Sequence, residues 1–157
     1  MARMIQISQG EHDGKGLKVG VVTARFNPEV TEKLEQGALK KLEELGCEDI
    51  QAVRVPGAFE IPLAAKAMLD AGFDAVVALG AIIRGETSHY DYVCSAVERG
   101  CTELQIRTGK PVAFGVLTTE NDDQALDRAG GRHGNKGAEA AEVAVEMVRL
   151  IRKIGTK

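Results

Sequence analysis

Residues Asp74–Val93 read DAVVALGAIIRGETSHYDYV, and this stretch decides the fold. Its first half is an uninterrupted apolar run, the pattern of a strand buried on both faces of a parallel sheet. The run breaks at Gly85, and a helix-compatible stretch begins near Ser88. Because open α/β sheets bind ligands beyond the carboxyl ends of their strands, the polar residues that follow the run mark a candidate active site. These residues are Arg84, Thr87, Ser88, His89, Tyr90 and Asp91.

Three further apolar, β-branched runs predict the other strands of the sheet. The runs alternate with segments of helical length and periodicity, which predicts a parallel sheet with right-handed crossovers. We therefore expect an α/β fold, a three-layer sandwich whose four-stranded, flavodoxin-like sheet has the strand order 2-1-3-4 and helices on both faces. The expected strands are 17–24, 50–55, 75–83 and 111–117, and the expected helices are 28–45, 60–71, 88–108, 122–129 and 136–154.

Length and composition narrow the possible functions. The 157 residues suit one domain, spanning 1–157. A net charge of −3 gives no electrostatic reason to expect nucleic acid or an anionic membrane surface as a partner. No apolar run is long enough to cross a bilayer, and the first residues lack the features of a signal peptide. Three cysteines without metal-ligand spacing predict reduced, buried thiols, so we expect a cytoplasmic protein.

The segment Met4–Gln9 alternates apolar and polar residues ahead of a glycine-rich loop. Two structures fit this pattern. The segment is either a disordered tail or an edge strand that pairs with the sheet of a neighbouring subunit. The sequence alone does not choose between them.

Aromatic residues make up only 4% of the chain, yet three of its four phenylalanines are expected at or just beyond the carboxyl end of a strand. They are Phe26, Phe59 and Phe114. A single phenylalanine in such a place more often caps the core than contacts a ligand. Three at one edge of a sheet favour a crevice for a flat heterocycle. Glu60, next to Phe59 at a helix start, either favours the helix dipole or binds ligand hydroxyl groups.

The segment Gly80–Thr87, GAIIRGET, has the glycine spacing and the threonine of a phosphate-binding loop. Glu86 stands where that loop carries its lysine, so a nucleoside triphosphate is not expected. Backbone N–H groups at the start of the next helix remain suited to a single phosphate. Arg128 would supply the missing positive charge if its short helix folds over this edge of the sheet. Without other evidence, the simpler interpretation of Arg128 is a solvated cation on the surface of its helix.

His89 is the expected general acid and base, because its unperturbed pKa lies near neutrality and its neighbours include Thr87 and the possible phosphate loop. The chain has neither a Gly-x-Ser-x-Gly elbow nor a dinucleotide fingerprint after any strand. The other two histidines, His12 and His133, lie far apart in sequence, which argues against a metal centre.

Ordered motifs along nearly the whole chain resemble the lumazine synthase family. Each motif alone would be modest evidence, but together and in order they are specific. They are GVVTARFN (20–27), VRVPGAFEIP (53–62), ALGAIIRGETSHYDYV (78–93), FGVLTTEN (114–121) and RAGGRHGNKG (128–137), followed by a long helix.

The resemblance implies a reaction and an assembly. Members of the family condense 5-amino-6-(D-ribitylamino)uracil with 3,4-dihydroxy-2-butanone 4-phosphate, giving 6,7-dimethyl-8-ribityllumazine, phosphate and water in riboflavin biosynthesis. They need no metal and no organic cofactor. The expected partners are the two small substrates and further copies of the chain, as a pentamer and possibly a shell of pentamers. A riboflavin synthase is a possible partner.

The resemblance also implies roles for individual residues. Phe26 would stack on the pyrimidine ring, and Ala58–Glu60 and Ala81–Ile83 would hold the ring and the ribityl chain, with Glu60 bonding ribityl hydroxyls. Glu86 and Thr87 would contact phosphate through their backbones, and Arg128 would pair with it. His89 would transfer protons, while Phe114 and Arg128 would come from the adjacent subunit. Relatives often carry alanine at the position of Glu86, so this carboxylate adds negative charge near the expected phosphate.

Two other functions fit the same resemblance. One is the archaeal-type riboflavin synthase, and the other is a shell protein that binds lumazine or flavin without turnover. The presence of Phe26, Glu60, His89 and Arg128 together speaks against a purely structural role.

Overall fold

The computed structural model describes residues 3–156 and confirms the predicted fold. Its four-stranded sheet is parallel, with the order β2-β1-β3-β4. The observed strand ends lie within two residues of the predicted ones. The strands are β1 (Lys18–Ala24), β2 (Asp49–Val55), β3 (Ala75–Ile83) and β4 (Val112–Thr119).

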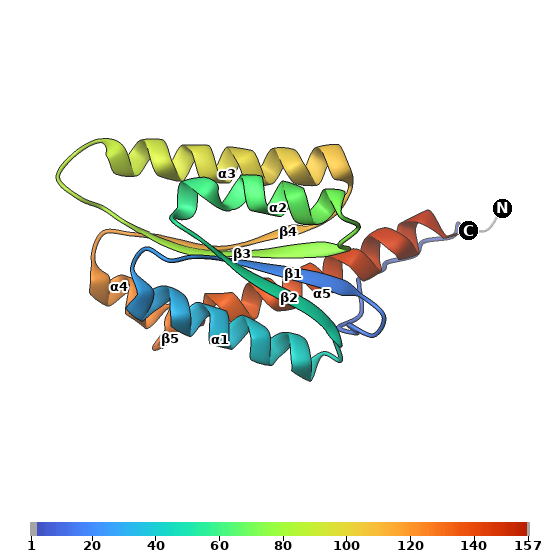
Figure 1. Cartoon of the computed structure of the whole chain (residues 1–157). Helices are drawn as coiled ribbons and strands as arrows, with labels where there is room; N and C mark the ends of the chain where they lie inside the picture. The colour runs from blue at the N-terminus through green and yellow to red at the C-terminus, as the bar shows by residue number, and fades with distance from the viewer. Residues whose placement is uncertain (1–2, 157) are drawn as a thin grey trace.

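Helices cover both faces of the sheet and complete the three layers (Figure 1). One core packs α1 and α5 against the sheet, and a second core packs α2 and α3 against its other face. A short hairpin of β5 and β6 follows α4, in a stretch for which the sequence predicted no strand. The elements are α1 (Pro28–Glu44), η1 (Ala58–Glu60), α2 (Ile61–Asp70), α3 (His89–Thr108), α4 (Asp122–Asp127), β5 (Ala129–Gly131), β6 (Gly134–Asn135) and α5 (Lys136–Gly155).

β3 lies inside the sheet between β1 and β4, which explains its continuous apolar sequence. All nine of its residues except the last are buried. Its register pairs Ile83 with Thr119, and the Arg84 amide donates to the Thr119 carbonyl at 2.9 Å just beyond the strand. Because the strands are parallel, the segments that follow β1, β2 and β3 emerge at one edge of the sheet.

The N-terminal segment runs beside α5 (Figure 1). Residues 3–8 form no strand within this chain, and the side chains of Met4 and Ile7 are almost fully exposed. From Gln9 onward, α5 holds the segment: Lys153 Nζ donates to the Gln9 carbonyl at 3.0 Å. Arg149 donates to two further carbonyls of this segment at 2.6 and 2.7 Å. Pairing of the exposed residues with a neighbouring subunit stays a prediction.

An ion pair on the α1 side of the sheet is a testable source of stability. The Arg54 guanidinium on β2 donates to both carboxylate oxygens of Glu35, at 2.7 and 3.2 Å. Glu35 is buried in α1, and its hydrogen bonds to Arg54 hold its pKa below the ordinary value, outweighing the burial that would raise it.

Replacing Arg54 with methionine should lower the free energy of unfolding, because the buried carboxylate of Glu35 loses two charge-assisted bonds. Urea unfolding at neutral pH measures this difference. Arg107→Met is the matched control: it breaks an exposed Arg107–Glu103 pair of 3.7 Å and should change little.

The same pair predicts a pH dependence. Because the pKa of Glu35 is lower in the folded protein than in the unfolded chain, the ion pair contributes its full stabilisation of the fold above the unfolded pKa of about 4.5. This contribution is lost as the pH falls through the lower pKa of the folded state. The stability difference between wild type and Arg54→Met should therefore shrink below about pH 4. A difference that stays constant from pH 7 to pH 3 would contradict this assignment.

Candidate active site

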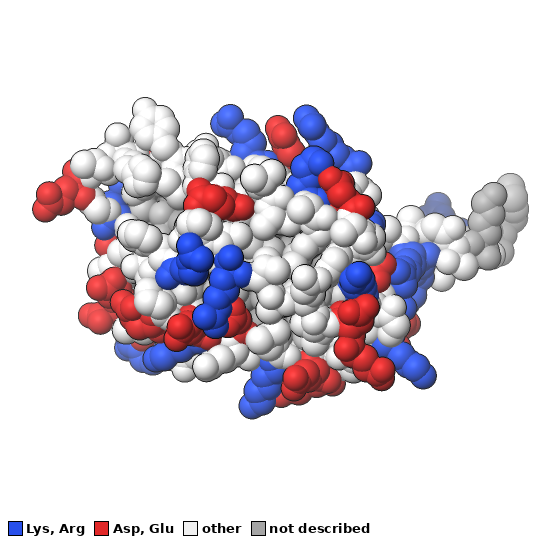
Figure 2. Space-filling model, viewed as in Figure 1, with Lys and Arg blue, Asp and Glu red and all other residues white. Residues whose placement is uncertain are grey.

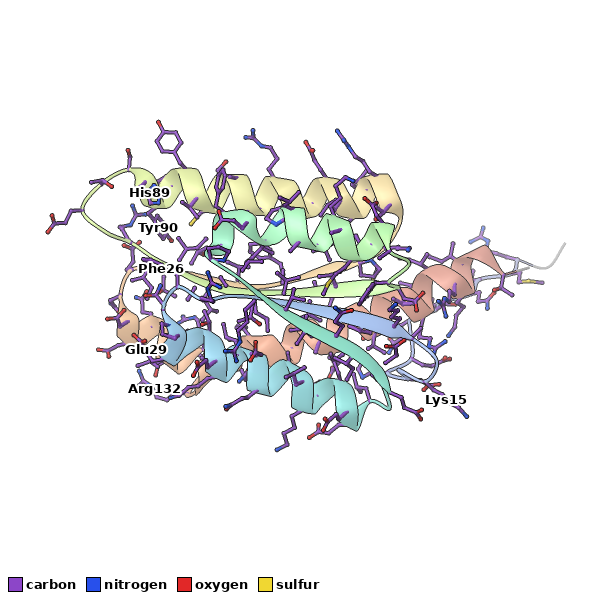
Figure 3. The ribbon with its side chains drawn as sticks, viewed as in Figure 1. Lys15, Phe26, Glu29, His89, Tyr90 and Arg132 are labelled. Carbon is purple, nitrogen blue, oxygen red and sulfur yellow. The ribbon has the colours of Figure 1, made fainter. Side chains whose placement is uncertain are left out.

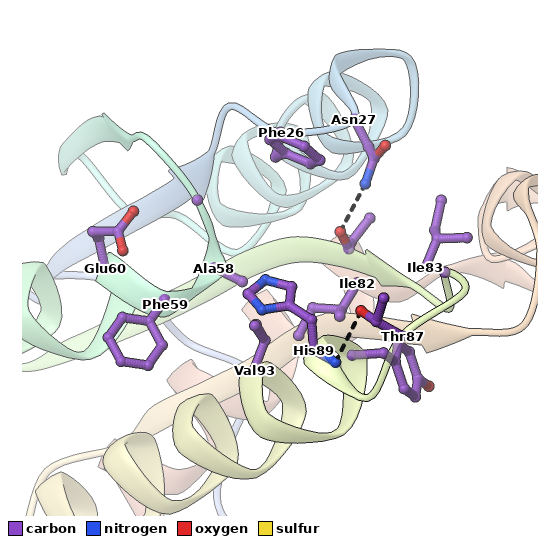
Figure 4. A pocket seen from close by; sticks show the side chains of 14 residues that line it. Phe26, Asn27, Ala58, Phe59, Glu60, Ile82, Ile83, Thr87, His89 and Val93 are labelled. Carbon is purple, nitrogen blue, oxygen red and sulfur yellow. Dashed lines mark hydrogen bonds between the residues drawn. The ribbon is translucent and has the colours of Figure 1, made fainter.

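A pocket of about 570 Å³ opens at the carboxyl edge of the sheet (Figure 4). Its size suits a small organic ligand. Segments following β1, β2 and β3 build it together with the first turn of α3. Its lining residues are Phe26, Asn27, Gly57, Ala58, Phe59, Glu60, Ala81, Ile82, Ile83, Gly85, Thr87, His89, Tyr90 and Val93.

Two exposed phenylalanines border this pocket. Phe26 and Phe59 are 71% and 63% exposed, whereas Phe73 is buried in the core. A ring left in water at the mouth of a pocket is available to stack on a flat ligand. Phe26, His89 and Tyr90 lie together at one end of the molecule, with Lys15 at the opposite end (Figure 3).

The turn between β1 and α1 places Phe26 over β3. Asn27 adopts a left-handed conformation with φ of 63°, and its side-chain amide donates to the Ala81 carbonyl at 3.0 Å. Asn27 stands at the N-cap position of α1, directly before Pro28, but its side chain makes no capping bond. The amide is turned toward β3 instead, where it fastens the turn to the centre of the sheet.

His89 is the first residue of α3 and its side chain is exposed. Its backbone N–H donates to Thr87 Oγ1 at 3.3 Å. Figure 4 shows the imidazole directed into the space that Phe26 and Ala58 border. The strand β3 therefore delivers a proton-transfer group to the same pocket as the aromatic rings.

Most of the predicted site residues meet in this pocket. The structure brings Phe26, His89 and Thr87 together with the segments Ala58–Glu60 and Ala81–Ile83. The carboxylate-bearing Glu86 is exposed and is not among the lining residues that the structure describes. Contact of its backbone with a phosphate stays a prediction.

Phe114 lies elsewhere, and the prediction that it sits at the carboxyl edge is wrong. β4 continues for five residues beyond Phe114, because Thr118 and Thr119 remain paired with the end of β3. Phe114 thus pairs with Ala78 in the middle of the sheet. Its side chain is 44% exposed on an edge strand and does not line the pocket of its own chain.

Arg128 is also absent from the lining of this pocket among residues 3–156. It follows α4, and its guanidinium donates to the Gln124 carbonyl at 2.9 Å. The start of α5 holds its backbone, since the Lys136 N–H donates to the Arg128 carbonyl at 2.8 Å. The chain therefore does not bring Arg128 into the pocket that contains its own His89.

The structure adds lining residues that the sequence did not single out as ligand contacts. Tyr90 and Val93 come from the first turns of α3, and Gly57 and Gly85 from the loops. Burial raises the pKa of the Tyr90 hydroxyl above its ordinary value. Tyr90 was among the polar residues that the sequence marked after the apolar run of β3, without a ligand contact assigned to it. For Asn27 the available signal was the frequent use of asparagine in left-handed turns.

Neither a group of metal ligands nor a membrane-spanning helix is found in the described part of the chain. Within the described residues, no group of three or more His, Cys, Asp or Glu side chains could hold a metal ion. No helix in that part of the chain is both long enough and apolar enough to cross a membrane. Acidic and basic side chains are interspersed over the face seen in Figure 2.

Comparison with known proteins places this sequence in a family. Residues 16–152 match the family described as 6,7-dimethyl-8-ribityllumazine synthase. A relative from Bdellovibrio bacteriovorus with the same description is 61% identical over 140 residues, which cover 88% of this chain and 77% of the relative. The matched region contains the whole pocket. The chain therefore belongs to the 6,7-dimethyl-8-ribityllumazine synthase family, as its sequence motifs indicated.

Proposed function

We propose that this enzyme of riboflavin biosynthesis condenses 5-amino-6-(D-ribitylamino)uracil with 3,4-dihydroxy-2-butanone 4-phosphate to give 6,7-dimethyl-8-ribityllumazine, phosphate and water. The observation that carries the proposal is the pocket itself. It joins exposed aromatic rings, one carboxylate and one imidazole at the carboxyl edge of the sheet. Membership of the synthase family supports this reaction.

The uracil substrate fits the apolar part of the pocket. Phe26 offers an exposed face on which the pyrimidine can stack, in the offset or edge geometry that aromatic pairs prefer. Ala58 and Ala81 are small and buried, so the backbone beside them can approach the ring closely. Glu60 lies in the same wall and can accept hydrogen bonds from ribityl hydroxyls.

The phosphorylated substrate fits the opposite part of the pocket, near the connection between β3 and α3. Backbone N–H groups at a helix start favour an anion, and Glu86 and Thr87 precede α3. Arg128 would pair with the phosphate from a neighbouring subunit. An arginine suits this task because its planar guanidinium can bind phosphate through two parallel hydrogen bonds.

His89 would then move protons between the two substrates. Formation of the imine bond releases water from the ketone carbonyl, and loss of phosphate requires a proton to leave the neighbouring carbon. Both steps need a group that gains and loses a proton near neutral pH. The exposed imidazole of His89, directed into the pocket, fits this task.

The family supports assembly into a homo-oligomer, and we propose that the active site lies between subunits of at least a pentamer. Phe114 and Arg128 are exposed or half-buried outside the pocket of their own chain, so a neighbour would present them. A closed shell and a bound riboflavin synthase are further proposals that the family resemblance suggests. Pairing of residues 4–9 with a neighbour's sheet would give the exposed Met4 and Ile7 a partner.

We also propose that the enzyme works in the cytoplasm, where thiols remain reduced. The three cysteines are unpaired in the structure. Cys101 is buried, and burial raises the pKa of its thiol to about 11, so it is inert.

A direct assay tests the reaction. The purified protein is mixed with both substrates, and lumazine and free phosphate are followed together, with the uncatalysed condensation subtracted. Equal rates of lumazine and phosphate release, both above the background, are expected. Lumazine supplied alone is the second arm: conversion of lumazine to riboflavin would identify a riboflavin synthase, and inactivity in both arms would favour a binding or shell protein.

Arg128→Lys should raise the KM for the butanone phosphate about tenfold and leave the KM for the uracil substrate unchanged. An ammonium group keeps the charge but loses the parallel pair of hydrogen bonds to phosphate. Steady-state kinetics with each substrate varied in turn measures both constants. An equal rise in the two constants would show that Arg128 holds structure instead of phosphate.

A further inference from the structure

Arg84 makes four contacts around the loop 85–88, which precedes the catalytic histidine. Its backbone N–H donates to the Thr119 carbonyl at 2.9 Å. Its Nε donates to Glu120 Oε2 at 2.8 Å, and an Nη atom lies 3.7 Å from Asp91 Oδ1. Its guanidinium carbon lies 4.3 Å from the centroid of the Tyr90 ring, a distance typical of a cation–π contact.

These contacts join three segments of the chain. Arg84 follows β3, Tyr90 and Asp91 belong to the first turn of α3, and Glu120 follows β4. The Arg84 side chain therefore closes the loop 85–88 at its base. We call Arg84, Tyr90 and Glu120 the loop clasp.

The loop has few other constraints. A Cβ added at Gly85 would meet no atom within 4 Å, and Glu86, Thr87 and Ser88 are exposed. The described bonds of the segment are local: the His89 N–H donates to Thr87 Oγ1, and the N–H groups of Asp91 and Tyr92 donate to the Ser88 carbonyl. Without the clasp, the loop and the first turn of α3 would be held mainly by the backbone on either side.

Arg84 is poorly placed to bind substrate itself. It does not line the pocket, whereas its partner Tyr90 does. Its Nε is already bonded to Glu120, and Tyr90 covers one face of the guanidinium. Any influence on the reaction must therefore pass through Tyr90 and the adjacent His89.

We propose that Arg84 is a positioning residue for the reaction, holding Tyr90 and the first turn of α3 so that His89 points into the pocket. This inference rests on the proposed function. The side chains of Arg84 and Glu120 are 41% and 59% exposed. Solvent therefore screens their charges, and their ion pair contributes little to global stability. Their effect should appear in the placement of a catalytic group, where small displacements are costly.

The test compares Arg84→Met and Glu120→Gln with Arg107→Met in the full-length assembled enzyme. We expect each clasp variant to lower kcat about tenfold with both KM values nearly unchanged, and Arg107→Met to change neither. The double variant should lose no more than about tenfold, because the two residues act as one unit. Arg84→Lys should recover only part of kcat, since ammonium keeps the ion pair but not the flat stack on Tyr90.

Two kinetic outcomes would overturn the proposal. Wild-type kcat in both clasp variants would show that the clasp does not position His89. A selective rise in the KM for the butanone phosphate at unchanged kcat would make Arg84 a direct phosphate ligand. If Arg84→Met does not fold, Glu120→Gln decides, because it breaks the same ion pair from the other side.

Amide hydrogen exchange separates this inference from the proposed function. Exchange at Asp91 and Tyr92, whose N–H groups bond to the Ser88 carbonyl, should accelerate in Arg84→Met but not in Arg107→Met. This measurement needs no substrate, so it remains decisive if the wild-type protein makes no lumazine. Unchanged exchange at both amides would overturn the clasp even in an active enzyme.

Discussion

Replacing His89 with alanine is expected to lower kcat about 10²–10⁴-fold, the range that a well-placed general acid and base contributes. The imidazole of His89 lines the described pocket, and Figure 4 shows it pointing into the cavity. Its loss removes proton transfer from imine formation and from phosphate release. Substrate affinity should be nearly unchanged, because Phe26 and Glu60 remain in place.

Steady-state rates at saturating concentrations of both substrates test this expectation, after subtraction of the condensation that occurs without enzyme. His12→Ala is the matched control. His12 is an exposed histidine far from the pocket, and its Nε2 lies 2.6 Å from Glu146 Oε1 on α5. Wild-type turnover in His89→Ala would remove His89 from the mechanism, whereas His12→Ala should keep full activity.

The fold was predictable because its strongest signals are local. β3 is a nine-residue apolar run in a chain with few other long ones, and its predicted limits, 75 and 83, are those observed. The hairpin β5–β6 could not be predicted in this way. Its sequence, AGGRHGN, has no apolar alternation, and it forms because backbone bonds join it to α4, including His133 N–H to the Asp127 carbonyl at 2.8 Å.

The site was predictable where its residues directly follow strands of the parallel sheet. Phe26, Phe59 and His89 each follow a strand of one parallel sheet, so their meeting follows from topology. Asn27 shows the limit of this reasoning. Its type and its place before Pro28 suggested a helix cap, but a tertiary hydrogen bond to Ala81 determined its conformation.

Phe114 and Arg128 show a second limit. The sequence motifs assign them to the site, yet the chain keeps both outside its own pocket. β4 is an edge strand, and β2, which leads to Phe59, is at the other edge of the same sheet. A single subunit does not bring these groups to one pocket, which is why we propose that a neighbouring subunit supplies Phe114 and Arg128.

Mixed oligomers of His89→Ala and Arg128→Ala subunits should regain about one quarter of wild-type activity. Each variant alone should be nearly inactive, since Arg128→Ala loses charge-assisted bonds to phosphate that are worth about 100-fold in kcat/KM. In a ring assembled at random from equal amounts, one site in about four combines His89 of one subunit with Arg128 of the next. The two variants are unfolded, mixed and refolded, and mass measurement confirms that the oligomers are mixed.

A second mixture provides the internal control, with wild-type subunits and the double variant His89→Ala/Arg128→Ala in equal amounts. A site shared between neighbours predicts about one quarter of the activity in both mixtures, because the two residues must come from different subunits. A site within one chain predicts no recovery in the first mixture and about one half in the second, since every wild-type subunit then carries a complete site. The ratio of the two activities thus decides where Arg128 acts, whatever the number of subunits in the assembly.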